Sequence, residues 1–268
     1  MPHMYEHNNN PTLNAQAEIW IARLTDLRAY RQELLILLSD VELSRCARYL
    51  QQDDRDRYLG GRALAKLATA KMTGLPLADI RIILATSGKP AIALAKHDVN
   101  APAISISHAG ELVVVALGYG ADIGVDVERL QHEVHLDDLM AVVCDLREIT
   151  AINRQDEKSR TQKFYEFWVL KEAYLKATGD GLSADARRLA FSVDSASAVS
   201  LLQGLEYRPD HVWDFLLKPY DQQHVLALAR RKTVSTELEN QGVSAHSTPV
   251  FRDAATLFRD FCSGKTRV

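Results

Sequence analysis

Two acidic residues on one predicted strand are the first group in the chain that could do chemistry. The segment Gly124-Val125-Asp126-Val127-Glu128 alternates glycine or acidic residues with valines. Because successive side chains of a strand point to opposite faces, Asp126 and Glu128 share one face with Gly124, and the valines share the other. Neighbouring carboxylates repel each other unless a cation lies between them, and clustered carboxylate oxygens suit Mg²⁺. The glycine would leave room for a ligand on the acidic face. Taken alone, the segment also fits a solvated acidic edge strand, which is the commoner case for a short motif.

A predicted helix over residues 163–178 carries the second group. At helical spacing Trp168, Glu172 and Lys176 lie on one face, each four residues from the next. The segment is rich in aromatic residues, so we expect the helix to be partly buried, and half-buried Glu and Lys usually have a partner or a task. An internal pair that only stabilises the helix would explain Glu172 and Lys176 but not the acidic strand. One site for a metal ion and a phosphate explains both groups.

Composition and charge exclude several classes of protein. Of the 268 residues, 47% are hydrophobic and 25% are charged, which is ordinary for a globular protein with a substantial core. The 32 basic and 35 acidic residues leave a formal net charge of −3. This balance does not favour broad binding to nucleic acid or to an anionic membrane, so we expect neither as a partner.

The cysteines and the apolar runs indicate a cytoplasmic protein. Cys46, Cys144 and Cys262 are odd in number and far apart, which fits neither a disulfide framework nor a zinc site. The first residues are polar and lack the apolar core of a signal peptide. The longest apolar run, residues 112–117, is too short to span a bilayer.

The order of predicted elements favours an α+β fold made of two similar lobes. Each half has helices followed by strands that look antiparallel, separated by Gly, Pro and Asn. The N-terminal half has predicted strands at 17–24, 80–85, 91–94, 103–107 and 112–117, and helices at 41–50 and 56–73. The C-terminal half has predicted strands at 122–128, 189–193, 213–218 and 225–229, and helices at 136–143, 145–153 and 163–178.

We therefore divide the chain into four parts. Residues 1–15 are expected to form a flexible lead, residues 16–119 one lobe, residues 120–232 the second lobe, and residues 233–268 a tail with an amphipathic helix at 251–261. The charged segment 155–163 is predicted to be a loop.

Several motifs together resemble one known family. The pair GVDVE and FYEFWVLKEAYLKATGDGL resembles the signature of the 4′-phosphopantetheinyl transferases, and the chain length resembles that of the surfactin-synthetase type. The segments RDRYLGGRALAKLA (55–68), SGKPAI (87–92) and ISISHAG (104–110) occur in the family's order and spacing. The resemblance covers roughly residues 45–193, and the combination of motifs is specific although each one alone is weak.

The resemblance implies a pseudo-twofold fold with coenzyme A in the cleft between two α/β lobes. By the same resemblance, Asp126, Glu128 and Glu172 bind Mg²⁺ (Mn²⁺ is possible). The catalytic residues would be Asp126, Glu172 and Lys176, with Lys176 meeting the phosphates and assisting the leaving group. The base that takes the serine proton would be Glu172 or a water held by the metal and Asp126.

The residues implied to bind coenzyme A are mostly basic, as its phosphates require. They are Arg57, Arg62, Lys89, Pro90, Ser107, His108, Lys171 and Lys176. Arg55 and Lys66 compete for the positions given to Arg57 and Arg62. A lone histidine after a strand is more often structural, so the role of His108 comes only from the resemblance.

The implied reaction transfers the 4′-phosphopantetheine arm of coenzyme A to a serine of an apo acyl or peptidyl carrier protein and releases 3′,5′-ADP. Another metal-dependent phosphoryl enzyme, or a non-catalytic protein that binds coenzyme A or a carrier, are the alternatives. Gln51-Gln52 and Val143-Cys144 depart from the family pattern, the latter in a region associated with carrier docking. Because two fused lobes already build the cleft, we expect a monomer.

Overall fold

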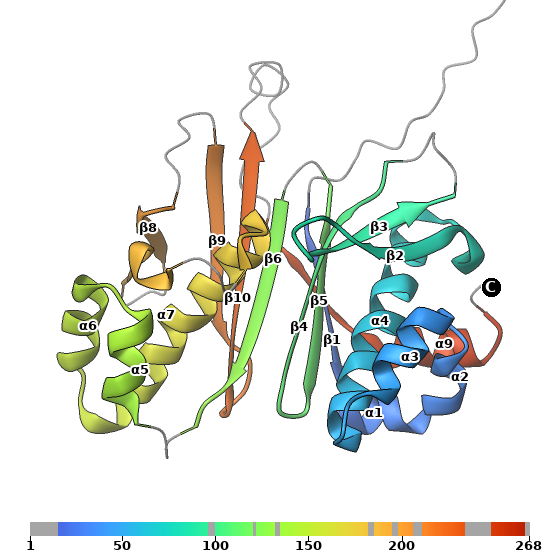
Figure 1. Ribbon diagram of the computed structural model, residues 1–268, viewed down its shortest axis with the longest axis horizontal. Coiled ribbons are helices and arrows are strands. Elements are labelled where there is room, and N and C mark those ends of the chain that lie inside the picture. The colour runs from blue at the N-terminus through green and yellow to red at the C-terminus, as the bar shows by residue number, and fades with distance from the viewer. Residues whose placement is uncertain are drawn as a thin grey trace, which may run out of the picture.

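Two β-sheets face each other in the middle of the molecule, and helices cover their outer faces (Figure 1). The computed structural model describes residues 16–95, 100–119, 122–131, 135–181, 185–194, 198–205, 211–233 and 248–265. The layers run helices, sheet, sheet, helices, so the predicted α+β class is confirmed. The predicted lead, residues 1–15, lies outside the described residues.

The N-terminal lobe contains a four-stranded sheet in the order β11-β1-β5-β4 and a two-stranded sheet, β2-β3. Its strands are β1 (Glu18–Arg23), β2 (Ile80–Leu84), β3 (Pro90–Leu94), β4 (Ala103–Ala109), β5 (Leu112–Gly118) and β11 (Val250–Asp253). Its helices are α1 (Leu24–Ala29), α2 (Arg31–Leu35), α3 (Asp40–Ala47), α4 (Gln52–Thr73), the 3₁₀ turn η1 (Leu77–Asp79) and α9 (Ala254–Cys262).

The C-terminal lobe contains a three-stranded sheet in the order β6-β10-β9 and a two-stranded sheet, β7-β8. Its strands are β6 (Asp122–Arg129), β7 (Ala190–Val193), β8 (Val199–Gln203), β9 (His211–Pro219) and β10 (His224–Thr233). Its helices are α5 (Leu136–Val143), α6 (Leu146–Asn153), α7 (Glu157–Thr178) and the 3₁₀ turn η3 (Ala186–Arg188).

The two lobes repeat one order of elements. Each has a 22-residue helix, α4 or α7, that ends at a glycine in the left-handed conformation, Gly74 (φ 71°) or Gly179 (φ 82°). Glycine suits this position because it has no Cβ to clash at positive φ. In both lobes a 3₁₀ turn, a two-stranded hairpin and two more strands follow the long helix, and the sheet orders β1-β5-β4 and β6-β10-β9 correspond. The lobes are therefore pseudo-symmetric.

Strand alternation assigns the apolar side chains to three cores. Ile123, Val125 and Val127 of β6 lie with Ile19 and Ile21 of β1 in a central core between the two sheets. The alternate side chains of each sheet pack instead against the long helix of their own lobe. Because the apolar face of β6 fills the central core, its acidic face is turned toward α7.

Two serine hydroxyls join the lobes where β4 runs beside β6. The backbone N–H of Val125 donates to Oγ of Ser105 at 3.0 Å, and that of Val127 donates to Oγ of Ser107 at 3.4 Å. No backbone ladder pairs these two strands in the described sheets. The seam is therefore held by side chains, and residues of β4 lie directly beside the carboxylates of β6.

Two sequence predictions need correction. Segment 155–163 is not a loop, since α7 already begins at Glu157, with the Asp156 side chain accepting a hydrogen bond from the Ser159 N–H as an N-cap. The predicted helix at 251–261 begins later, at Ala254, because residues 250–253 form β11, which pairs in parallel with β1. The tail thus completes the N-terminal sheet.

Candidate active site

Asp126 lies at the centre of the seam between the lobes. It is 3% exposed, and its Oδ1 accepts hydrogen bonds from Ser107 Oγ at 2.7 Å and Lys176 Nζ at 2.6 Å. Lys176 Nζ also donates to Ser107 Oγ at 2.9 Å. The other carboxylate oxygen, Oδ2, is buried and has no hydrogen-bond partner among the residues that the structure describes. A buried carboxylate oxygen without a partner is costly, so this atom is suited to a cation that the protein does not itself provide.

Glu128 lies on the same face of β6, as the strand periodicity predicts. Its Oε1 accepts a hydrogen bond from Trp168 Nε1 of α7 at 3.2 Å. Burial, followed by the charge of Asp126, raises the pKa of Glu128 to about 7. The raised pKa reflects mainly the burial of the carboxyl, with the charge of Asp126 adding to it.

Glu172 approaches the same group from α7. Burial, followed by the charge of Asp126, raises the pKa of the Glu172 carboxyl, and Lys176 opposes the shift. The helical face of Trp168, Glu172 and Lys176 therefore meets the acidic face of β6, as the spacing of these residues predicted. A half-buried carboxylate with a raised pKa is suited to accept a proton.

Strand β4 and helix α4 add a histidine and an arginine. His108 is exposed, but desolvation by its surroundings, followed by the positive charges of Lys176 and Arg57, lowers its pKa. Arg57 donates from Nε to the carbonyl oxygen of Gly110 at 2.9 Å and pairs with Asp54 at 2.7 Å. His108 thus lies within the influence of two basic side chains, Lys176 and Arg57, an arrangement suited to a phosphate ligand.

Lys89 crosses from the N-terminal lobe to the end of α7. Its Nζ donates to the carbonyl oxygen of Ala177 at 2.9 Å, in the last turn of the helix, where a positive charge is favourable. Desolvation by burial lowers the pKa of Lys89. Pro90 follows as the first residue of β3.

The glycine on the acidic strand has a different role from the one predicted. A Cβ on Gly124 would lie 1.9 Å from the carbonyl oxygen of Ala173 and 2.5 Å from the backbone nitrogen of Ala177. The space beside Gly124 is filled by the backbone of α7, and the expectation of room for a ligand is wrong. The glycine allows α7 to lie directly on β6.

The carboxylates fit a divalent cation in charge and donor type. Among the residues that the structure describes, no three or more His, Cys, Asp or Glu side chains are gathered closely enough to enclose an ion as they stand. Lys176 supplies one positive charge at Asp126, and Oδ2 of Asp126, which has no hydrogen-bond partner among the described residues, is free to bind a cation. Hard oxygen donors of this kind match Mg²⁺, which keeps other positions for water and phosphate.

Comparisons with known proteins agree with this arrangement. The sequence model described as the 4′-phosphopantetheinyl transferase superfamily matches residues 122–229, and that of the 4′-phosphopantetheinyl transferase N-terminal region matches residues 27–118. The chain belongs to the 4′-phosphopantetheinyl transferase superfamily. The two matches cover both lobes. As a member of this superfamily, the chain is a transferase that moves phosphopantetheine from coenzyme A to carrier proteins.

The curated relatives of this transferase have low sequence identity to it, but the matches cover most of this chain and most of each relative. The chain is 27% identical to 4′-phosphopantetheinyl transferase HetI of Nostoc sp., over 65% of this chain and 73% of the relative. It is 27% identical to the phosphopantetheinyl transferase of Thraustochytrium sp., over 80% of this chain and 78% of the relative. It is 24% identical to 4′-phosphopantetheinyl transferase Sfp of Bacillus subtilis, over 70% of this chain and 81% of the relative. The resemblance to the surfactin-synthetase type is thereby confirmed. Among the described residues of this transferase, no helix is both long and apolar enough to cross a bilayer.

Lys171 is not a coenzyme A ligand in this transferase, contrary to the prediction. It is 1% exposed, and its Nζ lies 2.7 Å from Oε2 of Glu148 and donates to the carbonyl oxygens of Ala186 and Leu189 at 2.8 and 2.6 Å. Although it neighbours Glu172 in sequence, it points into the C-terminal lobe because adjacent helical residues face different directions. All three of its protons are used within the protein.

Arg62 also lies away from the carboxylates. It is 9% exposed, with its guanidinium carbon 5.3 Å from the ring centre of Tyr58 and its Nε 3.9 Å from Oε1 of Glu42. These contacts hold it against α3. The role of Arg62 in coenzyme A binding stays a prediction.

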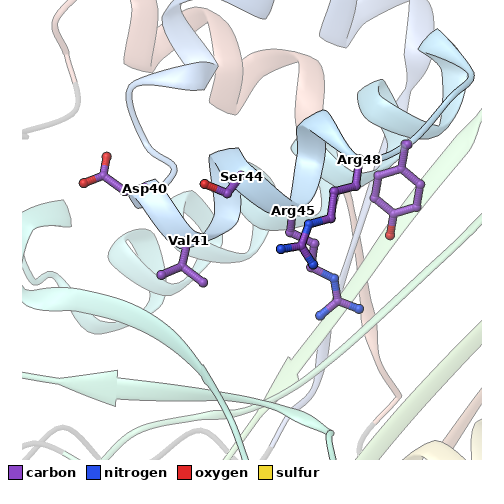
Figure 2. A pocket seen from close by; sticks show the side chains of 6 residues that line it. Asp40, Val41, Ser44, Arg45 and Arg48 are labelled. Carbon is purple, nitrogen blue, oxygen red and sulfur yellow. The ribbon is translucent and has the colours of Figure 1, made fainter.

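A basic pocket next to Tyr58 was missed by the sequence analysis. Arg45 of α3 and Arg48, which caps the C-terminal end of that helix, line a surface pocket of about 720 Å³ together with Tyr49 (Figure 2). The guanidinium carbon of Arg45 lies 5.8 Å from the ring centre of Tyr58. Two arginines three residues apart on one helix were the available signal, because such residues share a helical face.

Proposed function

We propose that this chain is a magnesium-dependent phosphopantetheinyl transferase that modifies a serine of an apo acyl or peptidyl carrier protein and releases 3′,5′-ADP. The observation that carries the proposal is the meeting of β6 and α7, in which Lys176 lies 2.6 Å from Asp126 and Trp168 contacts Glu128. Asp126, Glu128 and Glu172 would hold Mg²⁺, or Mn²⁺ in its place. When bound, the ion would neutralise charge on the pyrophosphate of coenzyme A.

Side chains of this protein would accept the serine proton, stabilise the leaving group and orient Asp126. Glu172, whose pKa is raised by burial, would accept the proton of the carrier serine as its oxygen attacks phosphorus. Lys176 would move from Asp126 toward the phosphates and stabilise the charge on the departing 3′,5′-ADP. Ser107 would keep Asp126 oriented through its 2.7 Å hydrogen bond.

The nucleotide end of coenzyme A would lie on the N-terminal lobe. Arg57 and His108 would contact phosphate oxygens, since His108 feels the positive charges of both Lys176 and Arg57. Lys89 and Pro90 would border the same end, with Lys89 linking the lobes through Ala177. The two lobes, the first of which includes β11 and α9, would therefore bind one cofactor between them.

Mass spectrometry of an apo carrier protein tests the proposal. Purified enzyme, coenzyme A and Mg²⁺ should add the mass of one phosphopantetheine arm to the carrier serine. Glu172→Gln should abolish the addition while the circular dichroism spectrum stays unchanged. Transfer by Glu172→Gln at the rate of the unmodified enzyme would refute the assignment. A panel of fatty-acid, polyketide and peptide carriers would then identify the preferred substrate.

A further inference from the structure

A buried lysine–glutamate pair anchors the long helix in each lobe. In the C-terminal lobe Lys171 of α7 pairs with Glu148 of α6 at 2.7 Å, with side chains 1% and 0% exposed. In the N-terminal lobe Lys66 of α4 pairs with Glu42 of α3 at 3.0 Å, with both side chains 9% exposed. Buried charges are uncommon unless paired, so both pairs have a specific role in the fold.

The two pairs occupy equivalent places. Glu42 and Glu148 are each the third residue of a capped helix, where they complete a capping box with Ser39 and Asp145. The lysines also correspond, since Lys66 precedes the helix-ending Gly74 by the same interval as Lys171 precedes Gly179. Each lysine further donates to a backbone carbonyl outside its own helix, that of Leu37 in one lobe and those of Ala186 and Leu189 in the other.

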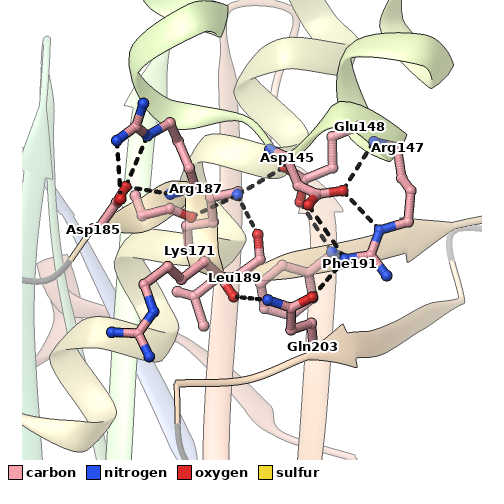
Figure 3. Close-up of polar contacts among 11 residues, drawn as sticks. Asp145, Arg147, Glu148, Lys171, Asp185, Arg187, Leu189, Phe191 and Gln203 are labelled. Atoms are coloured by element: carbon pink, nitrogen blue, oxygen red, sulfur yellow. Dashed lines mark hydrogen bonds and ion pairs between the residues drawn. The ribbon is translucent and has the colours of Figure 1, made fainter.

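The network around Lys171 is fully satisfied. Oε1 of Glu148 accepts from the Phe191 N–H at 2.9 Å, and Oε2 accepts from the Asp145 N–H at 2.9 Å (Figure 3). Together with the three bonds of Lys171, these contacts join α7 to the start of α6, to η3 and to β7. A complete buried network of this kind specifies one arrangement of the elements that it joins.

Only one of the two long helices carries catalytic groups. Lys171 immediately precedes Glu172, and the two side chains face opposite neighbours: Lys171 contacts Glu148, whereas Glu172 faces Asp126. On the β6 side, α7 rests on Gly124 without space for a Cβ. Helix α7 is therefore held from two sides, and a shift of its Lys171 side would rotate Glu172 and Lys176 relative to Asp126.

We propose that Lys171 and Glu148 are positioning residues for the transfer reaction, which fix the rotation of α7 and thereby the placement of Glu172 and Lys176. This inference rests on the proposed function of Glu172. Both side chains are buried, 1% and 0% exposed, and are bonded to each other rather than open to a ligand. The equivalent pair Lys66–Glu42 fixes α4, which carries Arg57 but no residue proposed to hold the metal ion or to accept the serine proton, and it supplies an internal control for kcat.

The test compares two neutral double variants, Lys171→Met with Glu148→Gln and Lys66→Met with Glu42→Gln. The C-terminal variant removes a buried charge pair without leaving one charge unpaired. The N-terminal variant also removes the Glu42 charge from Arg62, 3.9 Å away, so circular dichroism and thermal melting check that both variants fold. The C-terminal variant should lose kcat by roughly 10- to 100-fold, because small misplacement of catalytic groups is costly. Its KM for coenzyme A should change by less than about twofold. The N-terminal variant should retain kcat.

Hydrogen exchange gives a readout that does not depend on activity. Amides of residues 168–178 should exchange faster in the C-terminal variant and at the unmodified rate in the N-terminal one. Unchanged kcat and unchanged exchange in the C-terminal variant would overturn the proposal, as would equal losses of kcat in both variants. If the unmodified enzyme transferred nothing to carriers, or if Glu172→Gln were fully active, the proposed function would fail. The exchange comparison would then still decide whether the pair positions α7.

Discussion

Lys176 Nζ lies 2.6 Å from Asp126 Oδ1, although these residues stand fifty positions apart on a helix and a strand. Ser107, from the other lobe, donates to the same carboxylate oxygen at 2.7 Å. One carboxylate thus joins β4, β6 and α7. The other oxygen, Oδ2, is buried and accepts no hydrogen bond from the described residues. The protein therefore satisfies only one of the two carboxylate oxygens of Asp126.

Lys176→Met should lower kcat for carrier modification by roughly 100- to 1,000-fold, because the substitution removes a positive charge from the place where charge develops on the leaving group. Initial rates at saturating coenzyme A would measure the effect. Lys163→Met is the matched control on the same helix, since Lys163 pairs with Glu166 outside the site. A loss of the same size in the control would contradict the role given to Lys176.

Removal of divalent cations should abolish transfer, since the acidic group needs positive charge beyond that of Lys176. Treatment with EDTA followed by gel filtration should give an inactive protein, and Mg²⁺ or Mn²⁺ should restore the rate. Calorimetry should detect Mn²⁺ binding to the unmodified chain and weaker binding to Asp126→Asn. Full activity after rigorous chelation would exclude the metal role of the three carboxylates.

Gly124→Ala should inactivate the enzyme and lower its melting temperature, because the new Cβ would lie 1.9 Å from the carbonyl oxygen of Ala173. Backbone atoms cannot move aside as a flexible side chain can, so α7 must shift away from β6. Gly118→Ala is the control, since its Cβ would meet nothing closer than 3.5 Å, at Ile123. Transfer rates and melting temperatures of the two variants would test this prediction, and equal values for both would contradict it.

Asp56 should contribute stability that disappears in acid. It is 1% exposed and accepts hydrogen bonds from Arg28, Arg31 and Gln52. Burial raises its pKa, but the hydrogen bonds and the charge of Arg31 outweigh burial, and the pKa of Asp56 lies below its usual value. The stabilisation is therefore complete above the unfolded-state pKa of about 3.9 and is lost as the pH falls through the lower folded-state value.

Asp56→Asn should accordingly reduce the free energy of unfolding by about 2 kcal/mol at pH 7, with the difference narrowing below about pH 4. Urea titrations at several pH values would measure it. Asp53→Asn, which removes an exposed partner of Arg28, should cost less than about 1 kcal/mol. If the free energy of unfolding of Asp56→Asn differed from that of the unmodified protein by the same amount at pH 7 and at pH 3, the pKa of Asp56 would be the same in the folded and unfolded states, and the prediction would be wrong.

The sequence identified the faces of single elements well. The period of two in β6 separated Asp126 and Glu128 from the buried valines, and the four-residue spacing in α7 placed Glu172 and Lys176 together. Such patterns report which side chains share a face of one element. They do not report which neighbouring element covers that face, and for this reason the space at Gly124 was assigned to a ligand.

The remaining errors have the same origin or come from weak local signals. Lys171 is a basic residue within a family motif, but its partner Glu148 stands on another helix and no local pattern reveals the pairing. The first turn of α7 lacks apolar periodicity, although the Asp156 cap was present as a signal. The parallel pairing of β11 with β1 depends on contacts between opposite ends of the chain.

That pairing has a consequence for synthesis of the protein. Strand β1 lies between β5 and β11 in the sheet, and Phe258 of α9 is fully buried in the core of the N-terminal lobe. While the ribosome is still translating, β1 therefore lacks one neighbour, and the lobe made first lacks part of its interior. Domains usually fold in the order in which they emerge. Here the C-terminal lobe can finish first, and the earlier lobe closes only after residues 250–262 leave the exit tunnel.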